Sequence, residues 1–268
     1  MTYATLQTQR DGDVVTITLD RPEKRNALSL HALRELTAAL AEAGRSDATG
    51  VILAANGPVF SAGHNFSDMA GASVDAAREV FDACTAMMHT VQRIPQVVVA
   101  RVHALASAAG CQLVATCDLA VAAESASFAL PGGTGGLFCH TPLVAVARNV
   151  GRKRALELAL TGDRIDAVTA CEWGLINAAV PDHELHAATL DLLRRATRGS
   201  ALSKGLGKLT FYAQIELAQD EAYALASRQM AEAVALTADA QEGIAAFLAK
   251  RPAQFTGKAN EAGAAAMR

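Results

Sequence analysis

Two short runs of small residues have the composition of a site built from the main chain. Residues 60–65 (Phe-Ser-Ala-Gly-His-Asn) follow an expected strand and turn, and residues 108–112 (Ala-Ala-Gly-Cys-Gln) lead into an expected helix. Small side chains let a ligand approach the backbone closely, and the first turn of a helix has unpaired N–H groups and partial positive charge. Two such N–H groups directed at one carbonyl oxygen would form an oxyanion hole. The same residues would also permit close helix–strand packing, and spacing alone does not separate these interpretations.

Alternating short strands and helices must position these two runs. Apolar, β-branched segments predict strands at 14–19, 51–54, 97–102 and 118–122. Helical patterns are expected at 29–44, with Ser29 as the N-cap, at 73–93 and at 111–117. Only helices are expected from about residue 201 onward. The sequence therefore predicts an α/β core at 1–198 and a C-terminal helical region at 199–268.

Composition narrows the class of protein. The 268 residues are 51% hydrophobic, with 24 basic against 27 acidic side chains and no basic run, so we expect neither nucleic acid nor an anionic membrane surface as a partner. No apolar stretch approaches the roughly 18 residues that span a bilayer, and residues 1–10 lack the pattern of a secretory signal. Five cysteines without CxxC spacing predict reduced thiols, a cytoplasmic location and no metal site.

Seven short motifs, taken in order, resemble one known family. They are residues 19–22, 25–28, 60–64, 109–113, 117–122, 128–131, and 242–247 with 250–251. Together they are similar to the crotonase (enoyl-CoA hydratase/isomerase) superfamily over nearly the whole chain. Residues 106–112 and 136–139 are most similar to the enoyl-CoA hydratase domain-containing protein three branch of that superfamily.

The resemblance implies a fold, an assembly and a ligand. The fold is a spiral ββα core with a C-terminal helical region that packs homotrimers, often paired into hexamers. The ligand is an acyl-CoA, with coenzyme A as part of the substrate and no separate cofactor. The amides of His64 and Ala109 are implied to hold the thioester oxygen. The positions implied to contact coenzyme A are Lys24, Arg25, Asn26, Ala62, Gly63, Asn65, Phe66, Phe247 and Lys250, the last two commonly from a neighbouring subunit.

The chain departs from the family at the two positions that carry proton-transfer chemistry. Hydratases of the family use two glutamates twenty positions apart, and these fall on Gln112 and Gly132. A general acid or base must exchange a proton near the working pH. A glutamine amide can position water but cannot deprotonate it, so efficient hydration by the usual mechanism is not expected.

Three other residues have candidate roles at the site, and His140 and Cys139 are candidates to replace the glutamates. His140 falls where some relatives carry a working aspartate, and a neutral imidazole could act as a base there. Cys139 matches a tyrosine of the methylmalonyl-CoA decarboxylase relatives and could act as a nucleophile. His64 matches a histidine of the same relatives, and its side chain could donate near the thioester or a substrate carboxylate. Each also has a structural interpretation: His140 beside the start of a helix, Cys139 as a small buried side chain, and His64 through its backbone alone.

Three functions remain open on the sequence. The first is an enzyme that stabilises an enolate-like state of an acyl-CoA with a noncanonical acid or base. The second is a decarboxylase or other lyase, because loss of CO₂ needs a stabilised enolate but no base. The third is a non-catalytic acyl-CoA-binding protein.

Overall fold

The computed structural model describes residues 2–258, which form an α/β core followed by three C-terminal helices. Six strands form the main sheet, in which β1 is antiparallel to β2 and every other neighbouring pair is parallel. In spatial order they are β1 (Leu6–Asp11), β2 (Val14–Leu19), β3 (Gly50–Ala55), β4 (Val97–Val102), β6 (Leu119–Ala123) and β9 (Ala178–Val180). The expected α/β class with a C-terminal helical region is therefore confirmed. Residues 259–268 of the region expected at 199–268 lie outside the described range.

A second, shorter sheet runs beside the first. Its strands are β5 (Ala106–Ser107), β7 (Ser127–Ala129) and β8 (Ile165–Asp166). A single parallel bridge joins Ser61 to Ala106 of β5, and another joins Leu28 to His64. Both runs of small residues therefore meet at this short sheet.

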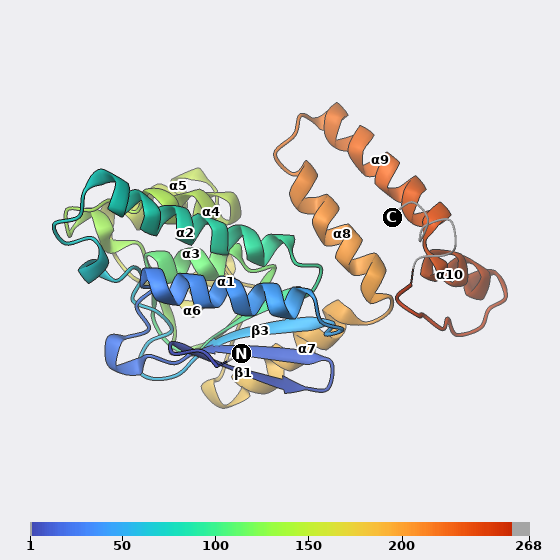
Figure 1. The fold of residues 1–268 in the computed structure, drawn as a ribbon, viewed down its shortest axis with the longest axis horizontal. Coiled ribbons are helices and arrows are strands. Elements are labelled where there is room, and N and C mark those ends of the chain that lie inside the picture. Colours follow the sequence, from blue (N-terminus) through green and yellow to red (C-terminus); the bar gives the residue numbers. More distant parts are fainter. Residues whose placement is uncertain (1, 259–268) are drawn as a thin grey trace.

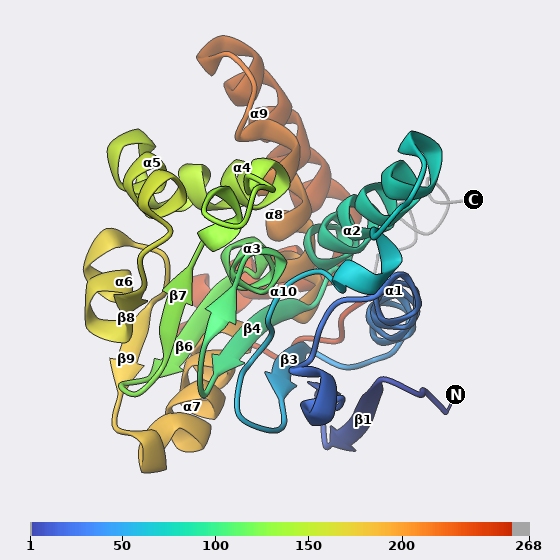
Figure 2. The ribbon, with the colours of Figure 1, turned by 90° about the vertical axis from the view of Figure 1, so that its left-hand side faces the viewer.

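Helices cover both faces of the main sheet. The core helices are α1 (Leu30–Gly44), α2 (Val74–Arg93), α3 (Ala109–Thr116), α4 (His140–Val150), α5 (Arg152–Thr161), α6 (Ala167–Trp173) and α7 (Leu185–Thr197). Figure 2 shows α1, α2 and α3 on one side and α7 on the other. Alternate residues of β3 follow this division, because Leu53 belongs to the larger core while Ile52 packs with Leu193 of α7. Burial of both faces explains why the strand is a continuous apolar run.

Helix boundaries follow the capping residues. The Ser29 hydroxyl accepts a hydrogen bond from the Ala32 amide, and Ser73 accepts one from Ala76, so α1 and α2 begin where serine caps predict. Strand β1 was not expected. It is an edge strand with nearly all its side chains exposed, so it lacks the apolar alternation that marks a strand.

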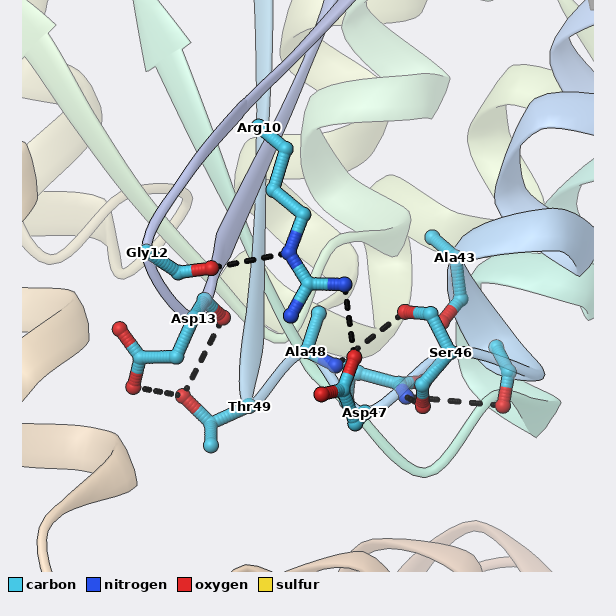
Figure 3. A network of polar contacts seen from close by, with 10 residues as sticks. Arg10, Gly12, Asp13, Ala43, Ser46, Asp47, Ala48 and Thr49 are labelled. Atoms are coloured by element: carbon cyan, nitrogen blue, oxygen red, sulfur yellow. Dashed lines mark hydrogen bonds and ion pairs between the residues drawn. The ribbon is translucent and has the colours of Figure 1, made fainter.

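A polar network ties the β1–β2 hairpin to the segment that enters β3 (Figure 3). Arg10 pairs with Asp47 at 2.6 Å and donates from Nε to the Gly12 carbonyl at 2.8 Å. The Thr49 hydroxyl donates to an Asp13 carboxylate oxygen at 2.7 Å. These exposed contacts fix the local geometry and each contributes little to stability.

The C-terminal helices α8 (Ala201–Gln214), α9 (Gln219–Leu236) and α10 (Ala238–Leu248) extend to the right of the core in Figure 1. Helix α9 has no buried residue. Large apolar side chains are exposed on α9 and α10, namely Tyr223, Met230, Val234, Ile244, Phe247 and Leu248. Such a surface is typical of a protein–protein contact. Among residues 2–258, no helix has the length and apolar character needed to cross a membrane.

Candidate functional site

The two runs of small residues are in direct contact. The Ser107 amide donates to the Ser61 carbonyl at 2.9 Å. A Cβ atom on Gly110 would lie 2.6 Å from the same carbonyl oxygen, and one on Gly63 would lie 3.2 Å from the Ala109 nitrogen. These distances are too short for a larger side chain at either glycine. Close approach of two backbones is thus the reason that glycine stands at positions 63 and 110.

One backbone amide in the first run has no acceptor. The Leu28 amide donates to the Gly63 carbonyl at 2.8 Å, and the Asn65 amide donates to the Leu28 carbonyl at 3.3 Å. The Ser61 hydroxyl bonds the Asn26 carbonyl at 2.8 Å and accepts from the Gly63 amide at 3.2 Å. Between these paired groups, the His64 amide has no acceptor within the described part of the chain.

A second unpaired amide lies at the start of α3. Ala108, the residue before the helix, has φ 49° and ψ −116°, a conformation that costs a residue with a side chain roughly 1–3 kcal/mol. Its own amide donates to Ala129 at 2.9 Å, and its carbonyl accepts the first helical bond from Gln112 at 2.9 Å. The amide of Ala109, like those of Gly110 and Cys111 in the same first turn, has no acceptor among residues 2–258. An unfavourable backbone torsion beside an unpaired buried donor is typical of a functional site.

Two polar side chains beside these amides are also unpaired. Both ring nitrogens of His64 and the Oε1 atom of Gln112 are buried and lack a hydrogen-bond partner among the described residues. The His64 ring packs edge-on against Phe81, with ring centroids 5.2 Å apart. Burial lowers the pKa of His64, and the nearby Leu28 backbone and the Asp68 carboxylate oppose this only in part, so the imidazole is neutral at pH 7.

Position 132, where the resemblance implies the second glutamate of the hydratases, is filled by the protein itself. A Cβ atom on Gly132 would meet the Leu137 carbonyl oxygen at 2.1 Å and the Cys139 sulfur at 2.8 Å. The Leu137 amide also donates to the Gly132 carbonyl at 2.9 Å, which closes the loop tightly. Position 132 therefore has no room for any side chain.

This packing leads to a prediction for a glutamate restored at position 132. We expect Gly132→Glu to destabilise the protein by at least about 1–3 kcal/mol, because the new side chain overpacks a closed loop. Combining it with Gln112→Glu is expected to give no gain in the hydration of crotonyl-CoA, followed by the loss of enoyl absorbance. The matched control is Gly135→Glu in the same loop, where the nearest atom to a Cβ is 3.7 Å away. A stable double variant with hydratase activity would show that the loop does not block this position.

The other candidate proton-transfer groups have different environments. Burial raises the pKa of the Cys139 thiol, although the Gly132 amide opposes this, so Cys139 is a thiol rather than a reactive thiolate. His140 is exposed at the first residue of α4, with its ring centroid 5.2 Å from that of Phe138. No group of three or more His, Cys, Asp or Glu side chains within residues 2–258 is arranged to hold a metal ion.

The residues implied to contact coenzyme A fall into two places. A cavity of about 250 Å³ is lined by Thr5, Arg21, Lys24, Ala27, Ser29, Asn65 and Ser67. Lys24 and Asn65 therefore line the same cavity. Arg25 follows Lys24 in the chain, and its carbonyl accepts a hydrogen bond from the Ala62 amide at 3.0 Å. Phe66 is the next residue after Asn65, and its ring is exposed. Phe247 lies in the last turn of α10 and Lys250 just after that helix, and Figure 1 shows α10 outside the core that contains this cavity.

Asn26 has a structural role that its sequence position did not predict. Its side chain is buried, accepts from the Arg21 amide at 2.9 Å and donates to the Asn56 and Val59 carbonyls. Its side-chain hydrogen bonds are thus used within the protein. The sequence also gave no sign of the Ala108 torsion, since nothing in an alanine marks a positive φ.

Comparisons with known proteins identify the family to which the sequence is similar. The enoyl-CoA hydratase/isomerase family matches residues 9–258. The chain is 45% identical over 245 residues to the human enoyl-CoA hydratase domain-containing protein 3, mitochondrial, covering 91% of this chain and 80% of that protein. It is 32% identical to a probable enoyl-CoA hydratase of Rhodobacter capsulatus, covering 96% of this chain and all of that protein.

Solved structures of the same family have a similar fold. The crystal structure of enoyl-CoA hydratase from Mycobacterium smegmatis superposes with a TM-score of 0.90 at 42% identity, covering 94% of this chain and 98% of that one. That of human enoyl-CoA hydratase domain-containing protein 3 gives 0.89 at 42% identity, covering 94% and 100%. The chain belongs to the enoyl-CoA hydratase/isomerase family and has the crotonase fold. Within that family it is similar to the enoyl-CoA hydratase domain-containing protein 3 group, as the sequence motifs predicted.

The expected cytoplasmic location is contradicted. Five vertebrate proteins named enoyl-CoA hydratase domain-containing protein 3, which are 41–45% identical to this chain, are named as mitochondrial. The prediction rested on reduced cysteines, and free thiols indicate a reducing compartment without identifying which one.

Proposed function

We propose that this protein binds acyl-CoA thioesters and stabilises an enolate-like state, with the thioester oxygen between the amides of His64 and Ala109. The observation that carries the proposal is the pair of unpaired amides on two segments in contact. Donors fixed in a buried site stabilise developing negative charge without reorganising, because the protein has already oriented them. The ligand class follows from membership in the enoyl-CoA hydratase/isomerase family, and the role is in acyl-CoA or fatty-acid metabolism.

The proposed activity is not ordinary hydration. Gln112 is an amide and position 132 is occupied by backbone, so neither glutamate of the hydratases has a counterpart that exchanges protons. His64 is a titratable residue of the proposed thioester site, and its lowered pKa keeps the imidazole neutral at pH 7. Any turnover would depend on polarising the thioester, with a proton exchanged through His64, His140 or water.

Coenzyme A and the assembly complete the proposal. The CoA moiety would lie along the cavity beside Lys24 and Asn65, where a lysine suits phosphate groups. The exposed Phe247 and Lys250 of a neighbouring copy would reach the same ligand in a homotrimer or hexamer, which would also bury the apolar surface of α9 and α10. On the names of the relatives, the proposed location is mitochondrial.

Infrared spectroscopy of a bound thioester tests the proposal directly. An acyl-CoA labelled with ¹³C at the thioester carbonyl would be added to the full-length protein. We expect its carbonyl band to move to lower wavenumber than in water, because two fixed donors polarise the bond more than solvent does. A bound ligand with an unshifted band, or no binding at all, would refute the assignment.

A further inference from the structure

Lys250 has a backbone conformation that disfavours a residue with a side chain. Among residues 2–258, four residues other than glycine have a positive φ, namely Arg25, Asn26, Ala108 and Lys250. Arg25 and Asn26 lie directly after a residue that lines the proposed coenzyme A cavity. Ala108 precedes the unpaired amide at the start of α3. Because such torsions concentrate at functional sites, the φ of 51° at Lys250 marks a candidate functional residue in the C-terminal helices.

The torsion of Lys250 ends α10. The Lys250 amide donates to the Phe247 carbonyl at 3.1 Å, and the Arg251 amide donates to the Ala246 carbonyl at 3.0 Å. These two bonds form a Schellman motif, in which position 250 is the left-handed residue after the helix. Glycine is favoured there because it has no Cβ. The lysine is thus unfavourable for the fold, and its exposed ammonium is the part of the residue that is free to serve another purpose.

The segment that follows Lys250 is fixed to α10 by Glu242. The Arg251 guanidinium donates to both carboxylate oxygens of Glu242, at 2.7 and 2.8 Å, and the Gln254 amide donates to the same carboxylate at 2.7 Å. A paired contact between arginine and carboxylate is directional as well as strong. Hydrogen bonding to Arg251 lowers the pKa of Glu242 to about 2, so the pair stays ionised at neutral pH. Glu242 therefore holds the chain immediately after the left-handed residue.

A second acidic residue of α10 holds the end of the same segment. Asp239 is only 3% exposed. Its carboxylate accepts from the Ser200 hydroxyl at 2.6 Å, from the Thr256 amide at 2.7 Å and from the Gly257 amide at 3.1 Å. Residues 249–257 are thus anchored at two points, one directly after the left-handed turn and one near their end.

We propose that Glu242 is a positioning residue, which fixes the turn at Lys250 so that the lysine is held ready for a phosphate of the coenzyme A bound by a neighbouring copy of the chain. This inference rests on the proposed function, which supplies the contact of Lys250 with coenzyme A. It adds the device that prepares the contact. A lysine on an unrestrained chain end would lose backbone as well as side-chain freedom on binding, and the ion pair removes the backbone part of that cost before the ligand arrives.

The test compares two thioesters by calorimetric titration of the full-length protein. Butanoyl-CoA has the nucleotide phosphates, and butanoyl-pantetheine lacks them. Glu242→Gln keeps the shape of the side chain and removes its charge. In this variant we expect the affinity for butanoyl-CoA to fall about three- to tenfold, and that for butanoyl-pantetheine to stay within about twofold of the wild type. The infrared band of the bound thioester carbonyl is expected to stay unchanged.

Lys250→Gly separates the use of the lysine from the needs of the fold. Glycine relieves the torsion, so the melting temperature is expected to rise by about 2–4 °C. The affinity for butanoyl-CoA is expected to fall at least as much as in Glu242→Gln. In the double variant the two losses should not add, because Glu242 acts through Lys250. Glu79→Gln, which breaks the exposed pair of Arg34 and Glu79, is the matched control and is expected to keep wild-type affinity.

The outcomes separate this inference from the proposed function. Unchanged butanoyl-CoA affinity in Glu242→Gln, an equal loss for both thioesters, or additive losses in the double variant would overturn the inference and leave thioester binding intact. A Lys250→Gly protein with a lower melting temperature or with full affinity would also overturn it. Failure of both thioesters to bind the wild-type protein would overturn both proposals. Arg251→Lys keeps the charge and loses the paired geometry, so it gives a second test in which the same selective loss is expected.

Discussion

Replacing Ala109 with proline is expected to lower the affinity for acyl-CoA thioesters about 10- to 100-fold and to abolish the infrared shift of the bound carbonyl. Proline removes one backbone N–H and nothing else that a ligand contacts through position 109. Ala109 is the first residue of α3, the helical position that accepts proline best, because its N–H has no partner within the helix. If the variant retains any turnover of a reactive thioester, the rate is expected to fall about 10²–10³-fold.

Proline at the start of another helix separates loss of this donor from a general effect of the substitution. Ala167 is the first residue of α6 and follows Asp166, whose extended backbone (φ −76°, ψ 174°) is compatible with a following proline. Ala167→Pro is expected to keep wild-type affinity and the shifted carbonyl band. Melting temperatures of both variants check folding, since Ala108 has an unusual torsion that a following proline constrains. A folded Ala109→Pro protein with unchanged affinity and an unchanged band would remove the amide of Ala109 from the site.

Sequence patterns were sufficient for most of the core elements. β2 and β4 have the expected boundaries of 14–19 and 97–102, and α1 begins after its serine cap. These predictions succeeded because burial of both sheet faces and capping leave local signals. The short strands β5, β7 and β8 were not foreseen. Two or three residues are too few to display a period of two, and their pairing partners are distant in sequence.

The site could be predicted only in part for a related reason. Residue types alone showed two runs of small residues, and only the family resemblance joined His64 to Ala109. Their proximity comes from the bridge between Ser61 and Ala106, a contact between segments about 45 positions apart in the chain. The sequence did show that Gln112 and Gly132 are not carboxylates. It could not show that the place of a side chain at 132 is filled, or that the Gln112 amide is unpaired, since both depend on tertiary packing.

Replacing Lys208 with methionine is expected to destabilise the protein by about 3–5 kcal/mol, because it leaves a buried carboxylate without its partner. Lys208 of α8 lies 2.7 Å from Asp118 and donates to the Val91 and Gln96 carbonyls at 2.8 and 2.7 Å. Asp118 also accepts from the Val98 amide and from the Tyr212 hydroxyl. This cluster joins the C-terminal helices to the end of α3, the helix that begins at the proposed thioester site.

The electrostatics give the loss of stability a specific pH dependence. Burial raises the pKa of Asp118, and the Lys208 ammonium is the main group that opposes the rise. Without Lys208 the folded-state pKa of Asp118 rises further above its unfolded value. The stability of Lys208→Met is therefore retained below the unfolded-state pKa of Asp118 and is lost as the pH rises through its folded-state pKa. Urea denaturation at several pH values should show that the difference in unfolding free energy from the wild type grows with pH.

Two comparisons test whether the unpaired charge is the cause. Lys204→Met removes an exposed lysine of the same helix and is expected to change stability by less than about 0.5 kcal/mol. Adding Asp118→Asn to Lys208→Met is expected to recover much of the loss at neutral pH, because the buried group is then neutral and a coupled pair is not additive. A loss in Lys208→Met no larger than in Lys204→Met, or one independent of pH, would show that the methylene stem of Lys208 and not its charge holds α8 to the core.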